Sequence, residues 1–468
     1  MRQFSILLIL LFSINLFAQQ DTCEINIQIK GESGGKARLI GIYVDQNFLA
    51  DSAIVDNQGK FTFRKKSPYK SGLFYVILPD QKTNFQFILD KEQRFSIVGD
   101  KSDLINSMKF TGSFENDLLY QSLIMQVQHE KTADSLYKLM QGKLPNDPNY
   151  VSAKNEIKNL GDARKKQLEN FGKKYPNSFF VKYKTAGQNP DIVDVRKPNG
   201  DLDTLGQLEL YRNQFWDNVD LNDERLLYTP VIANKLRKYI TELTPQNPDS
   251  IIRQSDIIIK KSMVNNEMFK FISNWIALNY QPTKTTVMDG EAVYVHIIDK
   301  YFTAERANWL TPKELTEIRK KAWEMQSSLL NKIGPDVVST DPNGNTKSIY
   351  EIKAPFVIVY MYNPNCEHCQ KETPKLKKFY DEWKSKGVEV FAIVLDSNDK
   401  EWRDYMEKNH MQEWINVFDP TNKSIYAKYF VDITPELYVL NKDRKIVGKN
   451  LKVEQLPIIL EREMRKMQ

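Results

Sequence analysis

Short apolar runs that partly alternate with polar residues fill the chain from about residue 24 to residue 112. Examples are "EINIQIKG", "ARLIGIYV" and "GLFYVILP", and Gly, Asn, Asp and Pro separate them. Alternation with a period of two predicts strands, and several short strands at close spacing are typical of a sandwich or barrel. Asn57-Gln58-Gly59 is expected to form a hairpin turn. We therefore predict an antiparallel β-sandwich-like domain over residues 22–113.

The apolar period becomes helical between residues 114 and 333, as in "ENDLLYQSLIMQVQHEK" and "TPKELTEIRKKAWEM". In the second run Thr311 is the expected N-cap, with Pro312 at the first helical position and Glu314 completing a capping box. Stretches rich in Pro and Asn, such as "LPNDPN" and "TPQNPDS", separate the helices. The pattern predicts a central all-α domain over residues 114–333.

Strand and helix patterns alternate over residues 334–468. The run "APFVIVYMY" reads as a buried strand, followed by a helix to about Lys386 and the strand "VEVFAIVL". Further helices are expected near residues 399–409 and 422–430, and a last helix from Glu454. Such alternation predicts a C-terminal domain with α/β layers.

The first residues read as a secretory signal. Arg2 precedes an apolar run from Phe4 to Phe17, and Ala18 stands before two glutamines. We predict a signal peptide over residues 1–18, cleaved near Ala18, and export to the periplasm or cell envelope. No later apolar run approaches the ~20 residues that span a bilayer, so no transmembrane segment is expected after signal removal.

The charge pattern argues against nucleic acid as a partner. The formal charge of +6 is small for 468 residues, and the lysines are interleaved with acidic residues. Such a mixture is typical of a solvated surface rather than a basic binding face.

The chain has three cysteines: Cys23, Cys366 and Cys369. One close pair and one distant thiol do not make the disulfide framework of a small secreted domain. We expect Cys23 to be a spare thiol near a mobile N-terminus. The pair in "NPNCEHCQ" is therefore the candidate for chemistry.

Cys366 follows the predicted buried strand and a Pro-containing turn, and it precedes a helix-forming run. A sulfur at a helix N-terminus meets unpaired N–H groups and the positive end of the macrodipole, which favour the thiolate. Cys369 lies one turn further along and is more shielded. We predict that Cys366 is the nucleophile, that Cys369 resolves a mixed disulfide, and that the two form a redox-active disulfide without a cofactor.

The residues between the cysteines are expected to tune the pair in opposite directions. A charged His368 would stabilise the Cys366 thiolate, whereas Glu367 would raise the pKa of the thiol. The sign of their net effect stays open at this point, and His368 is a candidate for pKa tuning.

Metal binding and an inert structural bond are alternative roles for the cysteines. A structural zinc site has four Cys or His ligands, and the sequence has no second pair of such residues at ligand spacing. Covalent attachment of haem requires a histidine at the position of Gln370. Copper(I) remains an alternative because two thiolates can bind it. A second alternative is a non-catalytic envelope binding or scaffold protein whose cysteines form an inert bond.

The stretch "VIVYMYNPNCEHCQKETPKL", followed by "ITPELYVLNKDRKIVGK", resembles the thioredoxin-fold domain of TlpA-like envelope thiol–disulfide oxidoreductases. The resemblance covers about residues 334–468 and implies a C-terminal α/β thioredoxin fold. The upstream segments "KFTGSFEND" and "YRNQFWDNVDLNDERLLYTP" are similar to modules of unknown function that precede thioredoxin domains in some Gram-negative envelope proteins.

This resemblance implies roles for further residues. The Thr434–Pro435 peptide bond is expected to be cis and to face the cysteine pair, and Glu372 matches a glutamate that can move protons during exchange. Two positions depart from the family pattern: Asn365 replaces a tryptophan, and Tyr360 stands where cytosolic thioredoxins have an acidic residue.

We therefore predict an enzyme, an exported thiol–disulfide oxidoreductase. Its expected partners are disulfide or thiol clients in the envelope and a thiol protein that supplies or accepts electrons. Glu367, Glu372 and the TlpA-like pattern favour a reductase or isomerase direction over an oxidase.

Overall fold

The computed structural model describes residues 23–282, 284–421, 425 and 428–467. The predicted signal peptide, residues 1–18, lies outside them, as does most of the helix predicted near 422–430. The chain forms two compact units, one ending at Tyr239 and the other beginning at Ile240. Among the described helices, none combines the length and apolar character needed to cross a membrane.

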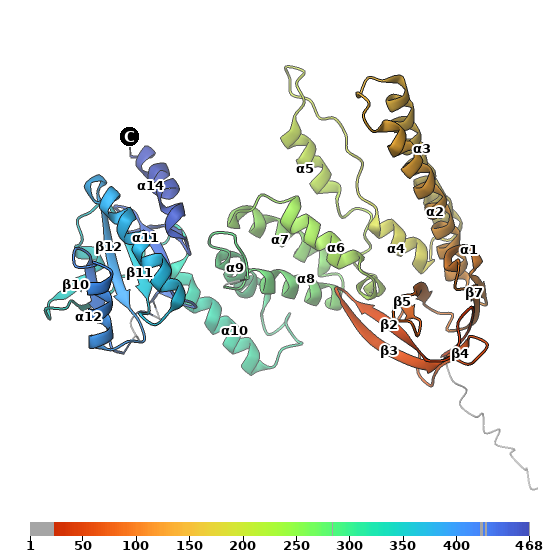
Figure 1. The fold of residues 1–468 in the computed structure, drawn as a ribbon, viewed down its shortest axis with the longest axis horizontal. Helices are drawn as coiled ribbons and strands as arrows, with labels where there is room; N and C mark the ends of the chain where they lie inside the picture. The colour runs from red at the N-terminus through yellow and green to blue at the C-terminus, as the bar shows by residue number, and fades with distance from the viewer. Residues whose placement is uncertain (1–22, 283, 422–424, 426–427, 468) are drawn as a thin grey trace, which may run out of the picture. The chain divides into compact units, whose positions relative to one another are not determined.

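The first unit begins with two four-stranded sheets, which confirms the predicted N-terminal β domain (Figure 1). One sheet has the order β4–β1–β7–β8 and the other β3–β2–β5–β6. The strands are β1 (Cys23–Lys30), β2 (Lys36–Tyr43), β3 (Gln46–Ile54), β4 (Lys60–Lys65), β5 (Gly72–Ile77), β6 (Asn84–Leu89), β7 (Arg94–Asp100) and β8 (Lys109–Thr111). The domain is not antiparallel throughout: β1 and β7 run parallel, and between β4 and β7 the chain passes through β5 and β6 of the other sheet.

Cys23 is a free thiol, as expected, but it stands in a strand of the sheet rather than in a loose terminal segment. Cys23 opens β1, and its side chain is fully buried. The reason is the strand period of two, which turns Cys23, Ile25, Ile27 and Ile29 to the same inner face.

Helices follow the β domain, as predicted. In the first unit they are α1 (Leu104–Ser107), α2 (Phe114–Met140), α3 (Pro148–Lys174), α4 (Phe179–Gly187), α5 (Thr204–Gln214), η1 (Glu224–Tyr228) and α6 (Val231–Arg237), after which η2 (Lys238–Glu242) spans the junction of the two units. The long helices α2 and α3 pack along each other (Figure 1). Asn116 fastens α2 to β6, because its buried side chain exchanges two hydrogen bonds with the main chain of Ile88.

The second unit starts with α7 (Pro248–Ser262), α8 (Asn266–Asn279), α9 (Glu291–Tyr301), α10 (Pro312–Met325) and the short η3 (Gln326–Ser328). The capping box predicted for α10 is confirmed. The Thr311 hydroxyl accepts the Glu314 N–H, and the Glu314 carboxylate accepts the Thr311 N–H.

A seven-stranded mixed sheet completes the second unit, in the order β10–β9–β13–β12–β11–β14–β15 among the described strands. Its strands are β9 (Val338–Thr340), β10 (Thr346–Ser348), β11 (Phe356–Tyr362), β12 (Val388–Val394), β13 (Ile415–Phe418), β14 (Glu436–Leu440) and β15 (Ile446–Lys449). The helices among them are η4 (Ile349–Glu351), α11 (Glu367–Trp383), η5 (Lys384–Lys386), α12 (Asp399–Lys408), η6 (Val453–Gln455) and α14 (Leu456–Arg465). The predicted α/β layering is thereby confirmed.

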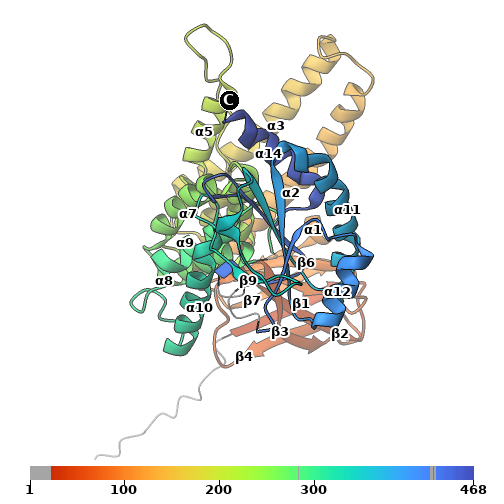
Figure 2. The ribbon, with the colours of Figure 1, turned by 90° about the vertical axis from the view of Figure 1, so that its left-hand side faces the viewer.

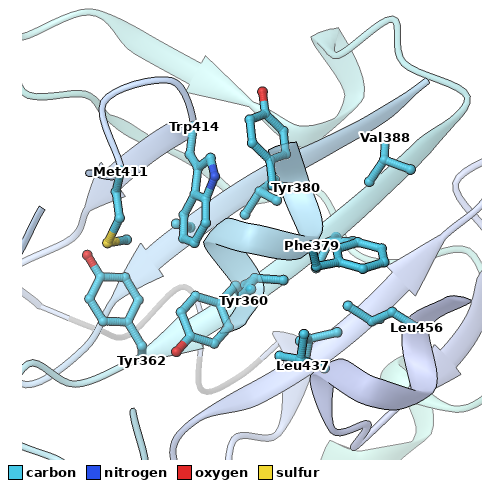
Figure 3. Packing of buried hydrophobic residues seen from close by; sticks show 14 of the residues in the cluster. Tyr360, Tyr362, Phe379, Tyr380, Val388, Met411, Trp414, Leu437 and Leu456 are labelled. Atoms are coloured by element: carbon cyan, nitrogen blue, oxygen red, sulfur yellow. The ribbon is translucent and has the colours of Figure 1, made fainter. Parts of the chain in front are cut away.

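Both faces of this sheet are covered, and every residue of the central strand β11 is buried. One face packs against α11, α12 and α14, which Figure 2 shows beside the strands. Figure 3 shows aromatic side chains filling this layer, among them Tyr360, Phe379 and Trp414. A strand buried on both faces reads as a continuous apolar run, which is why "FVIVYMY" predicted it. The buried β11 thus leads to the turn that precedes the cysteine pair.

Candidate active site

Cys366 is the N-cap residue of α11, at the carboxyl end of β11. The turn before it is closed by two hydrogen bonds, from the Asn365 N–H to the Asn363 side chain (2.7 Å) and from the Cys366 N–H to the Asn363 carbonyl (3.1 Å). The backbone of Cys366 is extended (φ −80°, ψ 122°), and its sulfur accepts the N–H of Cys369 at 3.3 Å. The sulfur thus caps the helix, as a serine or aspartate oxygen does elsewhere.

This position makes the Cys366 thiol acidic. Partial burial raises the pKa of this thiol. Hydrogen bonds to the sulfur from the Cys369 thiol and from the main-chain N–H groups of Cys369 and His368 lower the pKa by a larger amount. The net pKa therefore lies below that of an ordinary thiol. Cys366 is half-exposed, so that its thiolate is accessible to a disulfide.

Cys369 has the opposite environment. Its side chain is fully buried in the apolar cluster that also contains Tyr360, Phe379 and Trp414, and both cysteines are free thiols in this structure. Burial, together with its hydrogen bond to Cys366, raises the pKa of the Cys369 thiol to about 12. The two sulfurs therefore differ in both access and acidity.

The segment entering β14 faces the pair. The Thr434–Pro435 peptide bond is cis, and the Thr434 carbonyl accepts a hydrogen bond from the Cys366 thiol at 3.1 Å. The structure thus brings Cys366, Cys369 and Thr434 together from two places that are 68 residues apart in sequence.

The two residues between the cysteines, Glu367 and His368, are both exposed. Glu367 pairs with Lys371 at 2.6 Å, and this partner lowers the pKa of the Glu367 carboxyl group. The main chain of His368, rather than its ring, contributes to the hydrogen bonds around the Cys366 sulfur. Tuning by the imidazole stays a prediction.

Glu372 lies on the same helix, half-buried, with a side chain that is 21% exposed. Its carboxylate accepts a hydrogen bond from Lys375 at 2.7 Å, and the Val453 N–H lies 3.5 Å away. Lys375 also binds Glu454 at 2.8 Å. Proton transfer by Glu372 therefore stays a prediction that would require this ion pair to loosen.

A buried hydroxyl network behind Cys369 was not predicted from the sequence. Thr373 donates to the Cys369 carbonyl (2.9 Å) and contacts the hydroxyls of Tyr360 (2.7 Å) and Tyr405 (2.8 Å). Burial raises the pKa of Tyr360 far above its usual value. This position therefore contributes a neutral hydroxyl group, whereas the acidic residue of cytosolic thioredoxins would contribute a charge. The available signal was the spacing of Thr373, four residues after Cys369 and on the same helix face.

Residues 355–446 match the thioredoxin-like family. The C-terminal domain is thioredoxin-like. Two domains of unknown function precede it, DUF4369 over residues 23–119 and DUF5106 over residues 205–332. The resemblance of the cysteine segment to TlpA-like proteins is thereby confirmed for this domain, and so is the predicted order of folds.

Curated relatives match the thioredoxin-like domain. A thiol-disulfide oxidoreductase ResA of Bacillus cereus is 26% identical over 120 residues, which are 26% of this chain and 68% of the relative. ResA of Bacillus subtilis is 27% identical over 113 residues, 24% of this chain and 62% of the relative. These relatives support the predicted class of enzyme, an oxidoreductase.

Solved structures are also similar. A thioredoxin-like protein from Bacteroides caccae is 18% identical, with a TM-score of 0.47, and the match covers 58% of this chain and 99% of that one. A domain of a possible thiol-disulfide isomerase from Cytophaga hutchinsonii is 31% identical, with a TM-score of 0.28, over 30% of this chain and 95% of that one.

The environments of the cysteines predict an order of alkylation. Iodoacetamide should label Cys366 at lower pH than the other two, because the thiolate reacts and the lowered pKa keeps it present further down the pH scale. Burial raises the pKa of Cys23 to about 11 and that of Cys369 to about 12. Mass spectrometry of the reduced chain across a pH series gives the midpoint for each cysteine. The Cys366→Ser variant should lose the low-pH label, and a Cys366 midpoint equal to that of free glutathione would contradict the assignment.

Proposed function

We propose that this protein is an exported thiol–disulfide oxidoreductase in which Cys366 and Cys369 exchange disulfides with envelope proteins. The observation that carries the proposal is the Cys366 sulfur at the N-terminus of α11, half-exposed, acidic and hydrogen-bonded to Cys369. The N-terminal pattern of residues 1–18 supports export.

In the reducing direction the Cys366 thiolate attacks one sulfur of a client disulfide. A mixed disulfide forms, and the other client sulfur leaves as a thiolate that takes up a proton. Cys369 loses its proton and attacks the Cys366 sulfur, which releases the second client thiol and leaves a Cys366–Cys369 disulfide. A thiol electron donor then reduces that disulfide with two electrons and two protons.

Resolution requires a base, because the Cys369 thiol has a pKa of about 12 and is protonated at neutral pH. We assign the proton transfer to Glu372, which lies three residues after Cys369 on the same helix and is only half-buried. Water or a client group could carry the proton between them. Thr434 and the cis Pro435 would align the client chain beside Cys366.

The reducing or isomerising direction is favoured over oxidation. Glu367 adds a carboxylate beside the nucleophile, and it counteracts the stabilisation of the thiolate. Cys369 is buried and protonated in the reduced pair. This state suits it to resolving a mixed disulfide, which frees the reduced client, rather than to donating a disulfide to a client.

Trapping tests the nucleophile and the resolving residue. The Cys369→Ser variant should accumulate mixed disulfides with clients in vivo, because nothing then attacks the Cys366 sulfur. Non-reducing gels and mass spectrometry would detect them, and the double variant that also carries Cys366→Ser should show none. If no trapped species forms, and reduction of insulin by the purified chain does not depend on Cys366, the proposed activity is refuted.

The equilibrium potential tests the direction. In glutathione buffers the Cys366/Cys369 couple should be more negative than the roughly −180 mV of protein disulfide isomerase. The ratio of reduced to oxidised chain can be read from the mass of alkylated protein. A potential near the approximately −120 mV of strong oxidants would assign the protein to the oxidising direction instead.

Glu372 can be tested against its neighbour. Glu372→Gln should slow resolution of the mixed disulfide by about tenfold or more, because general-base contributions are commonly of this size or larger. Rapid acid quench and mass spectrometry would follow the mixed disulfide in single turnovers. Glu454→Gln is the matched control, since Glu454 also binds Lys375. Equal effects of the two substitutions would show that the charge on Lys375, and not a base, is what matters.

A further inference from the structure

A cavity of about 790 Å³ lies beside the cysteine pair. His368, Ile433 and Pro435 form part of its wall on the thioredoxin-like side. Another part of the wall comes from residues 285–288, which precede α9 and lie within the region that matches DUF5106. The volume is typical of a site for a small molecule or a few residues of a peptide, and it is too small for a folded client.

The turn over residues 285–288 gives this wall a defined, largely apolar surface. The Val287 N–H binds the Thr285 hydroxyl at 3.1 Å, and the Gly290 N–H binds the Val287 carbonyl at 3.0 Å. Met288 is half-buried and packs against the same apolar cluster that contains Cys369. The side chain of Met288 thus extends the hydrophobic surface of the redox site.

Buried charges fasten this turn to the thioredoxin-like domain. Lys449 of β15 is 2% exposed and lies 3.4 Å from the Asp289 carboxylate and 3.5 Å from that of Glu291. Glu291 also accepts a hydrogen bond from Asn450 (2.8 Å), and Asp289 accepts one from the Leu330 N–H (2.9 Å). Because these groups are bonded, the two walls form one packed body within the second unit.

One residue that lines the cavity has a side-chain oxygen that receives no hydrogen bond from the described residues. Glu436, the residue after the cis Pro435, is 5% exposed and lines the cavity. Its Oε2 atom is fully shielded, and no described residue donates a hydrogen bond to it. Burial raises the pKa of Glu436 well above its usual value. A buried polar group without a partner is unusual, and a bound ligand would explain it.

We propose that this cavity binds the extended client segment next to the cysteine under exchange. The turn over residues 285–288 would contact an apolar side chain of that segment, and Glu436 would bind a main-chain amide. A peptide is the occupant that fits, because Pro435 lines the cavity and directly follows Thr434, whose carbonyl lies 3.1 Å from the Cys366 sulfur that a client would be bonded to. The inference rests on the proposed function and adds to it that residues of the helical region select the client.

Two variants of the full chain test this, one on each wall. Met288→Glu places a charge on the apolar turn, and Glu436→Leu removes the amide partner. For each, kcat/KM is measured with an unstructured disulfide peptide that has leucine next to the cysteine, and with dithionitrobenzoate, which lacks a peptide chain. The loss for the peptide should exceed the loss for the small disulfide by at least about tenfold. Met263→Glu and Glu461→Leu, at exposed positions, are the matched controls and should change the ratio less than about twofold.

The outcomes separate the two proposals. If the unmodified chain reduces neither substrate, the proposed function fails. If it reduces both, and Met288→Glu changes the two rates equally or not at all, exchange stands and the cavity assignment is overturned. Met288 is half-buried, so this variant decides the question even if Glu436→Leu fails to fold, which thermal unfolding would reveal.

Discussion

The hydrogen bond from the Cys369 N–H to the Cys366 sulfur is the contact on which the site depends. It exists because a fully buried strand ends in a tight turn and the next residue begins a helix, so unpaired amides point at the sulfur. The same bond that caps α11 also stabilises the thiolate. Structure and reactivity therefore cannot be separated at this position.

One turn of helix gives the two thiols opposite properties. The first stands at the more exposed end, where the amides of the first helical turn have no partner within the helix, and the second lies among aromatic rings that exclude water. The hydroxyl network of Thr373, Tyr360 and Tyr405 holds that second turn in place without adding charge. An asymmetric pair of this kind lets a client react at one sulfur while the other waits in its protonated form.

Much of this could be predicted because it is local. The cysteine spacing, the capping box at Thr311 and the buried run of β11 each have a signature within a few residues. The exceptions depend on residues distant in sequence. The parallel pairing of β1 with β7 and the burial of Cys23 need the returning strand, which no local pattern specifies. Burial of polar residues was equally hard to predict, because only the tertiary packing shows that Glu436 and Thr373 are enclosed. The roles of His368 and Glu372 depend on ring orientation and on the loosening of an ion pair, which sequence patterns do not encode.

The ion pairs of Lys449 have a consequence for how the redox domain can be studied. An excised fragment that begins at residue 334, where the sequence pattern changes, would leave behind both carboxylates that neutralise this ammonium. Removing the partner of a buried charge typically lowers the free energy of unfolding by about 3–5 kcal/mol, unless the charged group becomes hydrated. In such a fragment water would reach β15, and a truncated protein would therefore offer its substrates a different surface from that of the intact chain.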